Sequence, residues 1–397
     1  MPNPGLLASH NPRTHGKAFL NLIESGDWRL ANDPARPKIE NDGVPSAYFI
    51  SRLSISGEVQ MTARRPFIGM FLNLPEGDRE TSARRDAFLQ ELGPLPGLSV
   101  ATRFGAAEFD MYEQRAQELH DLRVDGAGPD LYFATCWPSL RALTKVRSHS
   151  KALSTPIVVA GVADLSADPE RNPDYASNVY AFISYGKNLC GEWPRLLRGV
   201  APNVVRAAVL YDMHRERPGA KDVYDEIVAE AGKLVPRLNV TRGIDCGSET
   251  DILEKDLLAF VNEAETPAGL IVAVSVLTAR KRQTVVDLMN RLKLPAVYPN
   301  RLYTMHDGNT KHGGLASVGT YLPELYRRAG SCANQIITQI EGKGRLPSPR
   351  IDIVQTGLSR DPKQTAVFET VINLSAAHAI GLTVPNETLA KASVIIR

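Results

Sequence analysis

The sequence lacks the signals that define several large classes of protein. It has no run of about 18 consecutive apolar residues, so we expect no transmembrane helix. Its 46 basic and 44 acidic residues leave a net charge of only +2, which gives no overall basic surface for nucleic acid. At roughly 150 residues per domain, a chain of 397 residues instead predicts two or three domains of an ordinary globular protein.

Cysteine is also scarce, and no two cysteines form a CxxC pair. The four cysteines lie far apart, beside apolar residues, at positions Cys136, Cys190, Cys246 and Cys332. Free cysteine is readily buried, so we expect four reduced, buried or half-buried thiols. The spacing argues against a disulfide framework or a zinc site. The stretch "MHDGNTKHGG" (305–314) contains two histidines and an aspartate, but their spacing fits no standard metal-ligand pattern and favours a Gly-rich loop.

Short catalytic and nucleotide-binding motifs are missing as well. No G-x-G-x-x-G follows an expected strand, and the sequence has neither a Walker loop nor a G-x-S-x-G elbow. No Cys/His pair or paired-carboxylate constellation stands out. The sequence therefore predicts no catalytic residues, no cofactor and no metal.

The first part of the chain has no regular pattern. Residues 1–64 are rich in Pro, Asn, Asp and Arg, and we expect an irregular extension, with Met61 as an alternative start. A secretory signal needs an apolar segment of about 7–15 residues after a basic start, and neither the N-terminus nor the stretch after Met61 has one. As written, the sequence predicts a cytoplasmic location.

From Pro66 onward, short apolar runs alternate with amphipathic helical patterns. We expect strands at 66–72, 98–104, 130–135, 154–162, 178–184, 204–212, 238–244, 268–275 and 294–299. The helix at 80–92 would open on a Thr81 or Ser82 cap. Continuous apolar strands separated by helices are typical of parallel sheets covered on both faces. The sequence thus predicts an α/β protein of two doubly wound, Rossmann-like lobes, at 65–185 and 186–302, with 303–397 returning to complete them.

In doubly wound sheets, ligands bind beyond the carboxyl ends of the strands, so an interlobe cleft is expected. After the strand at 130–135, Thr135 and Ser139 could offer hydroxyls, and Trp137 a flat apolar face, at a helix N-terminus suited to a carboxylate or phosphate. An ordinary capped helix with a packed tryptophan is an equal alternative. Cys136 lies beside this proposed anion site and has no assigned role.

Further turns hold polar residues with two interpretations each. Asp164 could accept from a ligand ammonium or cap its turn, and Asp212 more simply belongs to a solvated turn. Ser275 ends an expected strand, and Thr278 is an expected N-cap. The cations at 280–282 oppose the helix dipole; they form either a solvated face or a group that attracts something acidic near the cleft rim.

The C-terminal stretch "FETVINLSAAHAIGLTVP" (368–385) predicts a strand, a short helix and a stop. Asn373 would satisfy a buried polar partner or cap the helix that begins near Ser375. Gly381 would end this helix in a left-handed turn, and Pro385 would prevent its continuation. We interpret this stretch as scaffold.

Three segments resemble a known family. They are "KLPAVYPNRLY" (293–303), "GGLASVGTYLPELYRRAGSCANQIITQIEGKGRLPSP" (313–349) and "FETVINLSAAHAIGLTVPNETLAKASVII" (368–396). On these segments, the chain from Pro66 to its end resembles the substrate-binding proteins of ABC transporters, in their tryptophan/tyrosine-type branch. Val318 departs from the pattern, since the family has a tyrosine there.

The resemblance implies the type I periplasmic-binding-protein fold, in which two lobes joined by hinge crossovers close on a small ligand, often an amino acid or related acid. It implies a monomer that docks on an ABC permease and ATPase, and a periplasmic location. It places ligand loops at Asn73, Leu74, Thr135, Cys136, Trp137, Ser139, Asp164, Ser184, Tyr185, Asp212, Ser275, Tyr298 and Pro299, to which the residues themselves add Thr278. Two alternatives remain open at this point: a cytoplasmic ligand sensor on the same fold, and a two-lobe enzyme such as a sugar-nucleotide isomerase.

Overall fold

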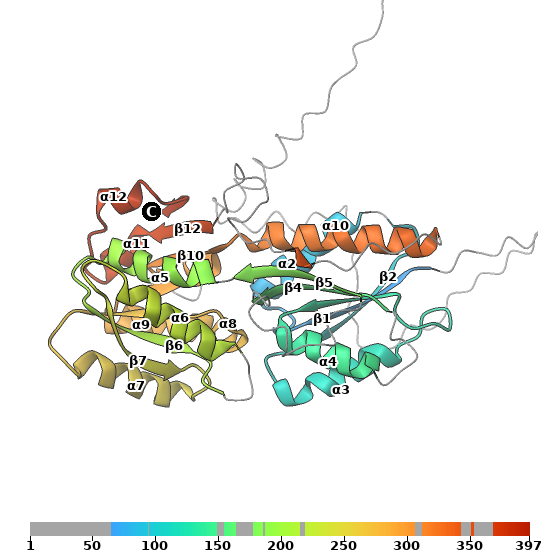
Figure 1. Ribbon diagram of the computed structural model, residues 1–397, viewed down its shortest axis with the longest axis horizontal. Coiled ribbons are helices and arrows are strands. Elements are labelled where there is room, and N and C mark those ends of the chain that lie inside the picture. Colours follow the sequence, from blue (N-terminus) through green and yellow to red (C-terminus); the bar gives the residue numbers. More distant parts are fainter. Residues whose placement is uncertain are drawn as a thin grey trace, which may run out of the picture. The chain divides into compact units, whose positions relative to one another are not determined.

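The computed structural model describes residues 65–93, 95–148, 155–163, 178–185, 187–214, 219–305, 312–342, 351–352 and 368–397. The expected extension at 1–64 and Asp164 lie outside these residues, as do Arg215, Arg217, His306 and Asp307. The described residues form two α/β lobes, each built on one sheet (Figure 1). No helix among them is both long enough and apolar enough to cross a membrane.

The first lobe is built on a six-stranded parallel sheet. Its strands, in spatial order, are β2 (Ser99–Phe104), β1 (Phe67–Leu72), β3 (Leu131–Thr135), β4 (Ile157–Ala163), β5 (Val179–Tyr185) and β11 (Ile351–Asp352). Its helices are α2 (Arg79–Leu92), η2 (Phe109–Met111), α3 (Tyr112–Asp121), α4 (Trp137–Ser148) and α10 (Leu322–Glu341). All six residues of β1 are buried because helices cover both faces. Ile68 and Met70 face the core under α2 and α10, and Phe71 faces the core under α3 and α4.

The second lobe is built on a seven-stranded sheet. Its strands, in spatial order, are β7 (Asn239–Asp245), β6 (Arg206–Tyr211), β8 (Ala268–Val272), β9 (Ala296–Tyr298), β10 (Ala316–Thr320), β12 (Phe368–Asn373) and β13 (Val394–Ile396). Its helices are α5 (Lys187–Val200), α6 (Ala220–Gly232), α7 (Thr250–Asn262), α8 (Val276–Arg280), α9 (Arg282–Leu292), η5 (Arg301–Tyr303), α11 (Leu374–Ala379) and α12 (Asn386–Leu389). The helices α5 and α6 cover one face of the sheet, and α7 and α9 cover the other.

The chain passes between the sheets at the ends of β5, β10 and β11. β5 lies in the first sheet and α5 in the second lobe, whereas β10 lies in the second sheet and α10 packs on the first lobe. The segment 303–397 therefore contributes to both sheets. Its boundaries as a domain remain a prediction.

One part of the second sheet differs from the expected parallel arrangement. β12 pairs antiparallel with β10, from Ala316 opposite Ile372 to Thr320 opposite Phe368. β10 carries the chain out of the second lobe, whereas β12 carries it back in, so the two strands run in opposite directions. β13 then pairs parallel with β12. The prediction of two doubly wound, mainly parallel α/β lobes is confirmed, with this antiparallel pair as the exception.

Two helix starts differ from the expected ones. The N-cap of α2 is Asp78, whose Oδ1 accepts from the backbone N–H groups of Glu80 and Thr81, so the Thr81 or Ser82 cap was wrong. The N-cap of α8 is Ser275. Thr278 is the third helical residue, N3, and its side chain completes the capping box with Ser275. Both helices begin earlier than expected because a capping carboxylate or hydroxyl was available upstream.

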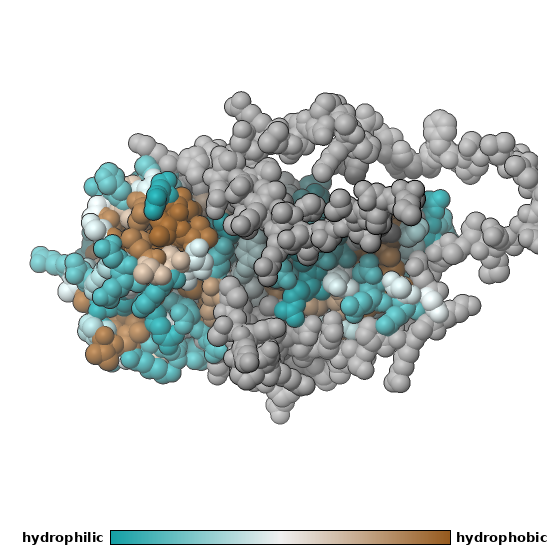
Figure 2. Space-filling model, turned by 90° about the horizontal axis from the view of Figure 1, so that it is seen from above, coloured by the Kyte–Doolittle hydropathy of each residue, from teal (hydrophilic) through white to brown (hydrophobic). Residues whose placement is uncertain are grey.

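The C-terminal stretch agrees with its prediction. Asn373 caps α11 through a bond from Ala376 N to its Oδ1 at 3.0 Å, and Gly381 follows with φ of +75°. Partly buried apolar side chains of this stretch and of the residues after it pack on the core of the second lobe; they are Leu374, Ile380, Leu382, Leu389 and Ala392. Figure 2 shows apolar side chains gathered over the part of the second lobe that carries α11 and α12. The segment is scaffold of the second lobe.

Candidate functional site

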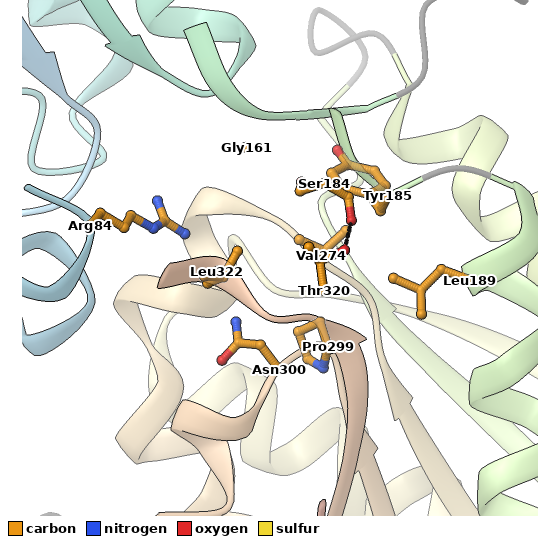
Figure 3. A pocket seen from close by; sticks show the side chains of 10 residues that line it. All are labelled: Arg84, Gly161, Ser184, Tyr185, Leu189, Val274, Pro299, Asn300, Thr320 and Leu322. Atoms are coloured by element: carbon orange, nitrogen blue, oxygen red, sulfur yellow. Dashed lines mark hydrogen bonds between the residues drawn. The ribbon is translucent and has the colours of Figure 1, made fainter. Parts of the chain in front are cut away.

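A pocket lies where two of the crossovers leave their sheets (Figure 3). Ser184 and Tyr185 reach it from the end of β5, and Thr320 and Leu322 reach it from the end of β10 and the start of α10. The remaining lining residues come from both lobes: Arg84 and Gly161 from the first, and Leu189, Val274, Pro299 and Asn300 from the second. Parallel strands of both sheets end here, which is the position that doubly wound sheets favour for ligands.

The pocket is tight in this arrangement of the lobes. Its described lining leaves about 40 Å³ open to the centres of water molecules, which is room for a few waters. The chain after Ala163, which includes Asp164, lies outside the described residues, so this volume refers to the described lining alone. A small organic molecule needs several times this space. The pocket as described is therefore too small to enclose such a molecule.

The floor of the pocket is fixed by a bond between the two crossover strands. Thr320 Oγ1 donates to the carbonyl oxygen of Ser184, and both residues are buried. Tyr185 follows directly, and burial raises the pKa of its phenol well above its ordinary value. The phenol is therefore neutral at physiological pH and can donate or accept a hydrogen bond.

One end of the pocket is rich in hydrogen-bond donors. Arg84 extends toward the pocket from α2, and its Nη1 donates to Asn73 Oδ1 at 3.1 Å. Asn300 lies across the pocket, with its amide nitrogen directed toward the space beside Arg84 (Figure 3). Its Oδ1 is occupied, because it accepts from Leu302 N at 3.0 Å and caps η5. This end of the pocket suits an acceptor or an anion.

Two of the predicted site residues, Asn73 and Thr135, support Arg84. Asn73 N donates to Thr135 Oγ1 at 2.9 Å, and Thr135 Oγ1 donates to Asn73 Oδ1 at 2.7 Å. Both side chains are buried, so each satisfies the other's polar atoms while Asn73 also accepts from Arg84. Adjacent Leu74 is fully buried in the core.

The turn after β3 also follows the expected pattern of a helix start. Cys136 adopts φ of +73°, a left-handed conformation that costs of order 1–3 kcal/mol for a residue other than glycine. Its thiol lies 3.5 Å from Ser139 Oγ, and burial raises the pKa of the thiol to about 11. Trp137 is half-buried and packs against the core under α3 and α4.

The predicted site residues of the second lobe lie in its strand ends and core. Asp212 is buried, and its Oδ1 accepts from His214 N at 3.1 Å. Ser275 and Thr278 are bound in the capping box of α8. Tyr298 is buried in the core and stacks on Tyr303, with ring centroids 5.2 Å apart.

Of the predicted set, Ser184, Tyr185 and Pro299 line the described pocket. Asn73 binds Arg84, which also lines it, and Thr135 in turn binds Asn73. That any of the set binds a ligand remains a prediction. Arg84, Asn300 and Thr320 line the pocket but were not predicted from the sequence. Val318, where the resembling family has a tyrosine, is buried in the second core, and its carbonyl oxygen accepts from Trp193 Nε1 at 2.9 Å.

Ion pairs join the two lobes beside the pocket. Arg282, at the start of α9, donates to Asp78 Oδ2 at 3.0 Å and to Glu80 Oε2 at 2.9 Å, both in the first lobe. Glu80 Oε1 also pairs with Arg84. Of the two expected roles for the cations at 280–282, the structure places Arg282 against an acidic partner, whereas Arg280 is exposed.

Comparisons with known proteins agree on the fold. No family model and no curated protein matches the sequence. An ABC domain from Streptococcus pneumoniae, solved in complex with L-Trp, superposes with a TM-score of 0.61 at 18% identity, covering 84% of this chain and 100% of its own. A conserved domain protein from Vibrio cholerae gives a TM-score of 0.61 at 16% identity, with the same coverage of both chains.

A ligand-free, open substrate-binding protein with adhesive properties from Clostridium difficile gives a TM-score of 0.51 at 18% identity, covering 83% of this chain and 99% of its own. At these identities the likeness concerns the fold. The chain has the two-lobe type I periplasmic-binding-protein fold, and its resemblance to the solute-binding proteins of ABC transporters is one of fold.

Proposed function

We propose that this protein binds a small organic solute between its lobes and serves as the solute-binding component of an ABC-type uptake system. The observation that carries this proposal is the pocket itself, which is lined by both lobes and by two crossovers. A ligand that touches both lobes favours the closed arrangement by its differential affinity for it. The closed, loaded protein would dock as a monomer on a permease and its ATPase, in the periplasm.

The ligand class that we propose is an amino acid or a related carboxylate. The pocket supports this with donors at one end, Arg84 and Asn300, and apolar side chains toward the other, Leu189 and Val274. The similar domain solved in complex with L-Trp lends further support.

The lining chemistry supports binding more than catalysis. Arg84 and Tyr185 are the titratable side chains in the described lining. An arginine stays protonated, and burial raises the pKa of Tyr185 well above neutrality. Neither group can act as a general base near pH 7, since a base must be poised close to the working pH.

A thermal-shift screen against amino acids and small carboxylates tests the proposal, with calorimetry on each compound that stabilises the protein. A bound solute raises the free energy of unfolding by RT ln(1 + [L]/Kd), about 2.7 kcal/mol at one hundred times Kd. Val274→Trp fills the pocket and should abolish the shift. Val205→Trp, at a residue that is 41% exposed, is the matched control and should keep it. A folded protein that no compound stabilises would contradict the proposal.

The location forms a separate part of the proposal. A cytoplasmic sensor would use the same pocket, so ligand binding does not distinguish the two. Fusing the full chain to a reporter enzyme that is active only in the periplasm separates them. An active fusion supports uptake, and an inactive, well-expressed fusion contradicts the periplasmic role.

A further inference from the structure

We propose that Arg282, which does not line the pocket, gives the pocket its preference for an anionic ligand when the lobes close. The ligand class is a small molecule with one carboxylate and an apolar body, with the carboxylate at Arg84 and Asn300. This inference rests on the proposed function and adds the residue that couples closure to the charge of the ligand. Arg282 acts through Glu80 and Arg84, so it is a positioning residue.

The connection runs through one buried carboxylate. The Glu80 side chain is 1% exposed and uses its two oxygens for two arginines, Oε1 for Arg84 and Oε2 for Arg282 at 2.9 Å. Arg84 lines the pocket from the same helix as Glu80, whereas Arg282 belongs to the other lobe. The bond from Arg282 to Glu80 exists only while the lobes are together.

The charges of this cluster change with the position of the lobes. In the first lobe alone, this cluster holds two carboxylates, Asp78 and Glu80, and one arginine, Arg84, so it has one carboxylate in excess. Arg282 brings the cluster to neutrality on closure. Opposite charges attract more strongly in a desolvated site than in water, and the Arg282 side chain is only 14% exposed. An anion beside Arg84 is therefore repelled in the open form and accepted in the closed one.

The Nε donor of Arg84 is available for such an anion. Its Nε is buried and has no hydrogen-bond partner among the described residues. The amide nitrogen of Asn300 is directed toward the same end of the pocket (Figure 3). A buried donor without a partner is costly, and a carboxylate oxygen would satisfy it. Closure then presents donors from both lobes to one anionic group.

The test compares carboxylates with their neutral amides by calorimetry on the full chain. The probes are L-tryptophan with L-tryptophanamide, L-leucine with L-leucinamide, and indole-3-acetate with indole-3-acetamide. We expect the wild type to prefer the acid of at least one pair. Arg282→Gln should lower the affinity for this acid by about 5–150-fold, the usual range of coupling between sites. Its affinity for the amide should change less than twofold.

Two variants control for charge and for folding. Arg280→Gln removes the exposed cation next to the cluster and should leave the ratio of acid to amide affinity at the wild-type value. Arg282→Lys keeps the charge and should retain most of the preference for the acid. The thermal midpoint of each variant without ligand shows whether it is folded.

Each outcome has one meaning. If Arg84→Gln removes the acid preference and Arg282→Gln leaves it unchanged, Arg282 merely joins the lobes and the inference is overturned. If acids and amides bind equally well to the wild type, the inference is overturned while the proposed solute binding stands. If neither member of any pair binds and the broader screen also fails, the proposed function fails with it.

Discussion

Thr320 Oγ1 donates a hydrogen bond to the carbonyl oxygen of Ser184 and so ties together the two strands that leave their sheets for the opposite lobe. The donor ends β10 and the acceptor lies near the end of β5, separated by 136 residues of chain. Both are about 8% exposed and line the pocket. The bond holds the crossovers in register at the base of the site.

Removing this hydroxyl should lower the free energy of unfolding without leaving a cavity. In Thr320→Val the carbonyl of Ser184 loses its partner in a buried setting, so we expect the free energy of unfolding to fall by about 1–3 kcal/mol. Thr320→Ser keeps the hydroxyl and should lose less than half as much. Urea denaturation of the three proteins measures the difference. Equal stability of the valine variant and the wild type would mean that the bond contributes nothing.

The strands were predictable because their chemistry is local. A parallel strand covered on both faces must be apolar along most of its length, and runs such as 66–72 and 207–211 have this property. The direction of β12 was not predictable, since it depends on which lobe the chain returns from. The capping residue Asp78 was missed because serine, threonine and aspartate all suit an N-cap, and three such residues lie within five positions.

The site was harder to predict because it is assembled by the fold. Arg84 has the appearance of an ordinary solvated cation on an amphipathic helix, and only the packing of α2 against the crossovers brings it to the pocket. Arg282 and Asp78 are 204 residues apart in the chain. The available signal was Glu80 four residues before Arg84, a spacing that pairs charges on one helix face. It does not indicate the second arginine that shares the carboxylate.

Arg206 is expected to be a major determinant of the stability of the second lobe. It is buried, and its guanidinium donates to backbone oxygens at and beyond the end of α7, those of Phe260, Val261, Ala264 and Thr266, at 2.7–3.2 Å. Arg206→Met would leave several carbonyls unsatisfied, so we expect a loss of roughly 3 kcal/mol or more in chemical denaturation. Arg242→Gln is the control. This side chain is 37% exposed, and its loss should cost less than about 1 kcal/mol.

Asn373 joins three parts of the second lobe, so its replacement should be costly. Besides capping α11, its Nδ2 donates to the carbonyl oxygens of Thr304 at 2.9 Å and His312 at 2.6 Å. Asn373→Ala removes all three bonds, and we expect a loss of about 2–4 kcal/mol. Asn373→Asp keeps the cap and loses both donors, so its free energy of unfolding should lie between those of the wild type and Asn373→Ala. Asn386→Ala, at an exposed residue, should stay within about 0.5 kcal/mol of the wild type.

The thiols should be unreactive in the native protein. All four cysteines are buried, and burial raises the pKa of Cys136 to about 11 and that of Cys246 to about 12. At pH 8 only about one Cys136 thiol in a thousand would be ionised, and the thiolate is the reactive form. A chromogenic disulfide reagent should therefore find no fast thiol before denaturation and four after it. Asn386→Cys adds an exposed thiol as a positive control. A fast native thiol in the wild type would contradict the burial.

Glu369 should make the stability depend on pH. Its side chain is 13% exposed, and burial raises the pKa of the carboxyl above its ordinary value, although Arg301 at 2.8 Å opposes the shift. Because the folded pKa lies above the unfolded one, the folded protein binds more protons between them. The free energy of unfolding should therefore fall as pH rises from about 4.5, the ordinary carboxyl value, through the folded pKa.

Glu369→Gln keeps a neutral group of the same size and should remove this part of the pH dependence. Urea denaturation from pH 4 to pH 7 should show the wild type losing stability relative to the variant as pH rises. Glu324→Gln, at a side chain 57% exposed, is the matched control and should follow the wild-type curve in this comparison. Parallel curves for wild type and Glu369→Gln would mean that Arg301 fully offsets the cost of burying the carboxylate.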